Sequence, residues 1–116
     1  MIKRCQDMSS VVKTEVRGGK GTMEMSILFN NDESFTAHLD KMAKVTLKPG
    51  SSIGMHSHDT TEEIYYILKG NALFYDNKEE RRLQPGDATI TGGGGTHSIE
   101  SLGPDTLEMV AVIVRK

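Results

Sequence analysis

Short segments of alternating apolar and polar residues, separated by glycine, proline and asparagine turns, recur along this chain from about residue 23 to its end. They comprise residues 35–39, 43–48, 63–69, 71–75, 80–83, 87–91, 96–100 and 106–114. Alternation with a period of two predicts half-buried β-strands, and no segment shows the period of an amphipathic helix. Many short strands, without helices to cover the faces of a parallel sheet, predict an all-β fold, either an antiparallel sandwich or a barrel.

The length of the chain, 116 residues, allows one hydrophobic core but not a second. We therefore expect a single domain, with an N-terminal arm and the first strands in residues 1–34 and a barrel in residues 35–116. The polar residues 1–22, with a glycine-rich loop at 17–21, either cross to a partner subunit or form a frayed terminus. Residues 106–114 are apolar on both faces, which predicts a strand inside a sheet or at a subunit contact.

The charges nearly cancel, with 14 basic and 16 acidic residues. No basic cluster interleaves with aromatic residues, so we expect no nucleic-acid partner. No apolar stretch approaches the roughly 18 residues of a membrane span, and the N-terminus has no apolar signal segment, so we expect no membrane partner and a cytoplasmic protein. The single cysteine, Cys5, cannot form an internal disulfide, which agrees with a reducing compartment.

Two histidines two residues apart, His56 and His58, are candidates for a metal site. Residues two apart in a strand point to the same face, so these imidazoles lie about 7 Å apart at Cβ and can converge on one ion. His97 begins a later strand, which could lie opposite both of them. A solvated, metal-free pair is the alternative for His56 and His58 alone. His38 lies in a polar run and is expected at the surface.

A carboxylate ligand follows the histidines. Alternation in the strand after residue 60 places Glu63, Tyr65 and Ile67 on one face and Glu62 on the other. One of the two glutamates must face the histidines. Glu63 is favoured because Tyr65 and Ile67 continue its face as core residues, although the opposite face is also apolar.

Three neutral imidazoles and one carboxylate suit a borderline divalent ion such as Mn, Fe, Co, Ni or Zn. They suit Ca and Mg poorly, because these ions prefer oxygen ligands. Four protein ligands on an octahedral ion leave two positions for water or a bidentate substrate. The pattern therefore favours a catalytic or ligand-binding metal over a closed, tetrahedral structural one.

At these residues the chain resembles the cupin superfamily. The first family motif is a glycine, five residues, His-x-His, three or four residues, a glutamate, six residues and a glycine. Gly50, His56, His58, Glu63 and Gly70 match it without exception. The resemblance thus assigns the carboxylate ligand to Glu63.

The second cupin motif is matched less completely. Gly86, Gly94 and His97 fit it, while Gly92 stands where the family has a proline and Ser101 where it has an asparagine. The histidine of this motif, His97, is present and supplies the fourth candidate ligand. The fifteen residues 71–85 between the motifs are the short separation typical of small microbial cupins.

The resemblance is closest to small single-domain, metal-binding cupins of the oxalate-decarboxylase-like type. It implies a double-stranded β-helix, or jelly-roll barrel, with one divalent ion at the wider end of the lumen. The implied ligands are His56, His58, Glu63 and His97, and the implied ion is manganese, with iron, nickel or zinc as alternatives. A homodimer and a small-molecule ligand are also implied.

Three functions remain open from the sequence. The first is a metal-dependent enzyme, a decarboxylase or dioxygenase acting on a small oxygenated metabolite such as oxalate. Its candidate catalytic residue is Tyr65, which could donate to a bound oxyanion, with Glu62 and Thr91 as alternatives. A structural role is the other interpretation of a buried tyrosine. The second function is metal-dependent binding or sensing of a small ligand without turnover. A third, sugar isomerisation, requires Lys44 or Lys48 to face the lumen.

Overall fold

The computed structural model describes residues 1–31, 38–77 and 79–115, which form an all-β structure with two 3₁₀ turns. The first half of the chain contains η1 (Cys5–Asp7), β1 (Ser9–Thr14), η2 (Val16–Gly18), β2 (Thr22–Asn30), β3 (Leu39–Leu47) and β4 (Ser52–His58). The second half contains β5 (Thr61–Lys69), β6 (Ala72–Asp76), β7 (Glu79–Leu83), β8 (Ala88–Thr91), β9 (Gly95–Ser101) and β10 (Leu107–Arg115).

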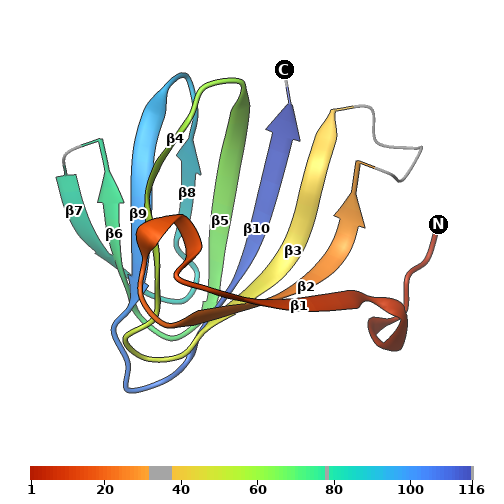
Figure 1. The fold of residues 1–116 in the computed structure, drawn as a ribbon, viewed down its shortest axis with the longest axis horizontal. Helices are drawn as coiled ribbons and strands as arrows, with labels where there is room; N and C mark the ends of the chain where they lie inside the picture. The colour runs from red at the N-terminus through yellow and green to blue at the C-terminus, as the bar shows by residue number, and fades with distance from the viewer. Residues whose placement is uncertain (32–37, 78, 116) are drawn as a thin grey trace.

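The strands form two antiparallel sheets, and the predicted jelly-roll class is confirmed (Figure 1). One sheet has the order β1-β2-β3-β10-β5-β8 and the other the order β4-β9-β6-β7. Alternate side chains of both sheets fill the core between them. Its buried apolar members are Met23, Met25, Ala43, Val45, Leu47, Ile53, Tyr65, Ile67, Ala72, Phe74, Ile99, Leu107, Met109 and Ala111.

The final strand, β10, lies inside the larger sheet between β3 and β5. Leu107, Met109 and Ala111 point into the core, while Val110 and Val112 face outward and are partly buried. The prediction that residues 106–114 form a strand inside a sheet is therefore confirmed. The outward valines extend an apolar outer face on this sheet.

The N-terminal residues are more ordered than the sequence indicated. β1 pairs with β2, so that residues 9–14 add an edge strand to the larger sheet. The glycine-rich loop expected at residues 17–21 begins inside the 3₁₀ turn η2, which packs against β4. The alternative of a frayed terminus is therefore wrong for residues 9–21. The expected boundary between residues 34 and 35 and most of the expected strand 35–39 lie outside the described residues.

Two smaller features lie at the surface of the fold. Residues 76 and 77 end β6 in a turn toward β7, with Asn77 in the left-handed region at φ 46°. His38 is exposed, as expected of a polar surface residue.

Within the part of the chain that is described, no helix is long and apolar enough to cross a membrane. The cytoplasmic location stays a prediction.

Candidate metal centre

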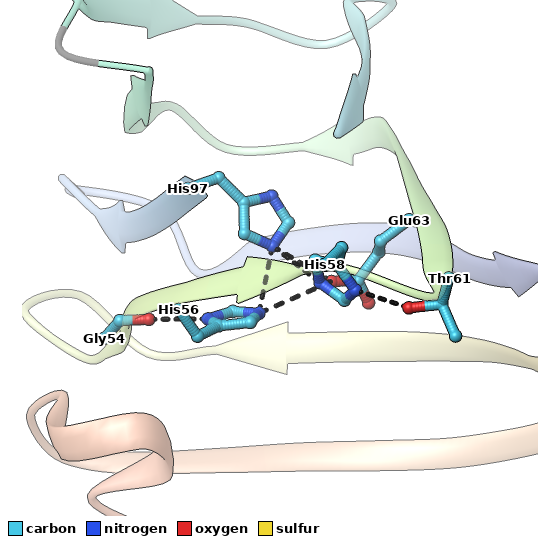
Figure 2. A network of polar contacts seen from close by, with 6 residues as sticks. All are labelled: Gly54, His56, His58, Thr61, Glu63 and His97. Atoms are coloured by element: carbon cyan, nitrogen blue, oxygen red, sulfur yellow. Dashed lines mark hydrogen bonds and ion pairs between the residues drawn. The ribbon is translucent and has the colours of Figure 1, made fainter. Parts of the chain in front are cut away.

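Three strands from the two sheets bring the four predicted ligands together. His56 and His58 lie on β4, Glu63 on β5 and His97 on β9. In the antiparallel pair β4–β9, His97 lies directly opposite His56, as the sequence suggested. The four ligand atoms lie within 4.8 Å of one another, and Figure 2 shows the side chains converging. We refer to these four residues as the ligand group.

Distances within the ligand group match the spacing of neighbouring ligands on one ion. His97 Nε2 lies 3.0 Å from His56 Nε2 and 3.2 Å from His58 Nε2. Glu63 Oε1 lies 3.1 Å from Nε2 of both His58 and His97 and 3.8 Å from His56 Nε2. Ligands at about 2.1 Å from an ion and at right angles are about 3.0 Å apart, against about 3.4 Å for a tetrahedron. The shortest separations therefore suit adjacent positions of an octahedral ion.

Hydrogen bonds behind the imidazoles fix which nitrogen faces inward (Figure 2). His56 Nδ1–H donates to the Gly54 carbonyl at 2.7 Å, and because a carbonyl only accepts, the lone pair of His56 lies on Nε2. His58 Nδ1 lies 2.8 Å from Thr61 Oγ1, a hydroxyl that can accept the Nδ1 proton and so leave the lone pair of His58 on Nε2. Such partners orient metal-binding histidines. Two imidazole lone pairs and a carboxylate thus converge, which is an arrangement for a cation.

His97 is oriented by packing instead. Its side chain is fully buried, and among the described residues its Nδ1 has no hydrogen-bond partner. The ring stacks on that of Tyr65, with centroids 5.2 Å apart and an angle of 6° between the planes. Phe74 packs against its edge at 5.8 Å. The two aromatic rings therefore hold Nε2 of His97 toward the other ligands.

The electrostatics of the ligand group keep its donors in the metal-binding forms. Burial lowers the pKa of His58, and the neighbouring His97 and His56 lower it further against the opposite effect of Glu63. Burial raises the pKa of Glu63, but the polar contacts with the His56 and His97 imidazoles and the charges of His97 and His58 outweigh it and lower that pKa to about 2. At neutral pH the group therefore offers a neutral His58 and an anionic Glu63.

The glycine run 92–95, which replaces the proline-containing loop of the family motif, is held in place by hydrogen bonds. Gly94 N–H donates to the His58 carbonyl at 2.9 Å. Asn77 Oδ1 accepts from Thr96 N–H at 2.9 Å, immediately before His97. Gly93 and Gly94 have φ of 63° and 82°, a region that glycine adopts without strain. The loop thus links the β4 and β9 ligands directly.

The structure has Glu63, and not Glu62, on the face of β5 that points toward the histidines, as predicted. Glu63 is buried in the ligand group, whereas Glu62 is half-buried elsewhere, with its side chain against Gly92. Thr91 is buried opposite Glu63 but does not line the cavity described below. Lys44 is exposed and pairs with Glu108 on the outer face at 3.3 Å. Lys48 is exposed as well, so the inward orientation that a sugar isomerase would require is not found for either lysine.

Tyr65 is buried at the wall of the same cavity. Burial raises its pKa well above the ordinary value, and the charge and hydrogen bond of Glu63 raise it further. The phenol is therefore protonated and able to donate a hydrogen bond. Whether it takes part in a reaction stays a prediction.

A cavity of about 150 Å³ opens onto the ligand group. Its polar lining residues include Lys13, Arg17 and Lys41, none of which the sequence identified. Lys41 shares the inward face of β3 with Ala43 and Val45, so alternation could have found it. Lys13 and Arg17 come from the polar N-terminal arm, which carried no such signal. Two larger hollows, each about 340 Å³, lie elsewhere on the surface and contain no residue of the ligand group.

Known proteins of similar sequence and structure share this arrangement of strands. The chain is 39% identical over 114 residues to the oxalate-binding protein of Thermotoga maritima, covering 98% of this chain and 93% of that one. The crystal structure of a predicted oxalate decarboxylase from Thermotoga maritima superposes with a TM-score of 0.93 at 37% identity, over the full length of both chains. The cupin domain of Schizosaccharomyces pombe Cnp3 has a TM-score of 0.73 at 14% identity, over 91% of this chain and 69% of that one, a likeness of fold alone.

The family itself is identified by the sequence between β3 and β10. Residues 43–113 match the model of the cupin domain, a range that includes the whole ligand group and most of both sheets. The fold, the three histidines and the glutamate all agree with that match. This chain therefore belongs to the cupin domain family.

Proposed function

We propose that this protein holds one divalent transition-metal ion on the ligand group and binds a small carboxylic acid such as oxalate at that ion. The observation that carries the proposal is the convergence of imidazole lone pairs and one carboxylate at the floor of a cavity. Manganese is the proposed ion, with iron, nickel or zinc as alternatives, because nitrogen-rich mixed donors suit all four. The 39% identical relative is named for binding oxalate, which supports this ligand class.

Some residues around the ligand group would orient the metal ligands, and others would shield the bound acid from water. Gly54 and Thr61 fix the imidazoles of His56 and His58, and Tyr65 and Phe74 hold His97. When bound, the ion supplies a Lewis acid that attracts and polarises carboxylate oxygens. Apolar side chains on the cavity walls limit the water around a bound acid. They are Val16, Met23, Met25, Val45, Ile53, Ala111 and Ile113.

The second candidate function is turnover of the bound acid, by decarboxylation or dioxygenation. Tyr65 is the observation that favours it, because a buried, protonated phenol beside Glu63 could donate a hydrogen bond to a bound oxyanion. The resemblance of the fold to a predicted oxalate decarboxylase adds support. Tyr65→Phe removes only the hydroxyl, so turnover that survives this change would exclude the phenol as the donor.

Oxalate should bind to the manganese-loaded protein and not to protein stripped of metal by a chelator. The physical reason is that, in this proposal, the ion provides the main attraction for the acid. Isothermal titration calorimetry of both forms measures the difference, and assays for carbon dioxide and formate in the same samples separate binding from decarboxylation. Equal binding to the two forms would refute a metal-bound ligand.

We also propose a homodimer that packs through the outer face of β5 and β8. Tyr66 and Leu68 on β5 and Ile90 on β8 are 46%, 44% and 59% exposed. The two strands pair with Ile64 opposite Ile90, so the exposed side chains form one patch. A second copy offers the same apolar patch about a two-fold axis, the commonest form of homo-oligomer.

Ile90→Lys should convert this dimer into a monomer, because it places an unpaired charge on the apolar patch at its most exposed residue. Met55→Lys is the matched control, since Met55 is 47% exposed on β4, in the other sheet. Size-exclusion chromatography with light scattering, at several concentrations, reports the mass of each variant. A monomeric wild type, or an Ile90→Lys dimer as tight as wild type, would contradict the proposal.

A further inference from the structure

The N-terminal segment, which lies outside both cupin motifs, borders the cavity at the metal centre. The turn η2 packs on β4, the strand that carries His56 and His58 (Figure 1). Lys20 N–H donates to Ser52 Oγ at 2.8 Å, and Ser52 N–H donates to the Lys20 carbonyl at 2.8 Å. These two bonds tie the end of the turn to the start of β4.

Two glycines allow the turn to lie directly on the strand. A Cβ on Gly54 would overlap the Arg17 carbonyl, and a Cβ on Gly19 would overlap the Ser52 carbonyl. Arg17 itself has φ 54° and ψ 32°, a left-handed conformation that is uncommon for residues other than glycine. Such a conformation persists only where surrounding contacts impose it. The packing therefore fixes the backbone of Arg17 beside the cavity, which its exposed side chain helps to line.

The cavity carries an excess of positive charge. Lys13, Arg17 and Lys41 line it, and the one acidic lining residue, Glu63, belongs to the ligand group. Within the described part of the chain, no carboxylate lies within 4.0 Å of the charged groups of these three cations.

The size of the cavity limits what this charge can attract. A volume of about 150 Å³ is well below the roughly 300–1,000 Å³ of sites that take drug-sized ligands. It suits an acid of a few carbon atoms. When such an acid places oxygens on an ion at the cavity floor, a dicarboxylate still has charged oxygens directed away from the ion, whereas a monocarboxylate has no second charged group.

On the basis of the proposed function, we infer that Lys13, Arg17 and Lys41 form a cationic rim that binds the outer oxygens of a metal-bound acid and selects a small dianion over a monoanion. The N-terminal arm is then part of the ligand site. Arg17 is the member whose backbone is held by close packing against β4. The ligand group determines whether a metal binds, and the rim determines which acid the metal-loaded protein prefers.

The test compares Arg17→Gln with wild type, both loaded with manganese, by calorimetric titration of oxalate and of glycolate, a monoanion that can also chelate an ion. Oxalate affinity should fall about tenfold in the variant, the size expected for one lost hydrogen bond to a charged group, and glycolate affinity should fall less. Arg17→Lys should retain most of the preference for oxalate. Arg82→Gln, on the exposed strand β7, loses the same charge outside the cavity and should match wild type.

Manganese content, measured on each sample, should stay at the wild-type value, because none of these substitutions alters a ligand. Wild-type oxalate affinity in Arg17→Gln, or an equal loss for oxalate and glycolate, would overturn the inference and leave the proposed function standing. If manganese-loaded wild type binds neither acid, the proposed function fails and the inference fails with it.

Discussion

Glu63→Gln should abolish stoichiometric manganese binding, from about one equivalent in wild type to a small fraction. Glu63 is the only anionic member of the ligand group, and its Oε1 lies 3.1 Å from two of the imidazole nitrogens. The substitution keeps the shape of the side chain but removes the charge that offsets a divalent ion. Substituting a residue that hydrogen-bonds to a metal ligand typically lowers metal affinity 10–100-fold. Replacing a ligand itself should therefore lower it about 100-fold or more. Elemental analysis and a competitive metal titration measure the loss.

Glu62→Gln is the matched control. It changes the same residue type at the adjacent position, but Glu62 lies outside the ligand group and packs near Gly92. Its metal content should equal that of wild type, and circular dichroism should show that both variants are folded. Full manganese occupancy in Glu63→Gln would refute the site. Loss of metal in Glu62→Gln alone would show that the other face of β5 supplies the ligand.

The ligands were predictable from the sequence because strand geometry fixes which side chains share a face. The spacing of His56 and His58 placed both on one side of a strand. The core residues after Glu63 favoured one phase of β5, and the first cupin motif assigned Glu63 as the carboxylate. The register of β4 against β9, which places His97 opposite His56, needed only one antiparallel pairing. The first two steps are local in the sequence, whereas the third joins residues 41 apart and was only a possibility until the structure showed the pairing.

The N-terminal contribution could not be predicted in this way. Every side chain of β1 is exposed, so residues 9–14 show no alternation between buried and solvent faces. The position of Arg17 depends on the absence of side chains at Gly19 and Gly54, which are 35 residues apart in the sequence numbering (54 minus 19). The Gly54 carbonyl that fixes the His56 tautomer is likewise a backbone group, about which side-chain patterns say nothing.

Removing the metal should lower the melting temperature of wild type by about 10 °C relative to protein in excess manganese. A ligand that binds only the folded state stabilises it by about 2.7 kcal/mol at one hundred times its dissociation constant. For a domain of this size, each kcal/mol shifts the melting temperature by about 4 °C. The folded state is the one that binds, because its ligands come from three strands that separate on unfolding.

Differential scanning fluorimetry over a series of manganese concentrations measures this effect. The melting temperature of wild type should rise with the logarithm of free manganese once the site is saturated, since each tenfold increase adds about 1.4 kcal/mol to the stability. Glu63→Gln should show no such rise over the same range, whereas Glu62→Gln should follow wild type. A wild-type melting temperature that does not respond to manganese, iron, nickel or zinc would mean that the ligand group binds none of them tightly. In that case its four side chains would have to be explained as a buried polar network, in which His97 Nδ1 has no hydrogen-bond partner among the described residues.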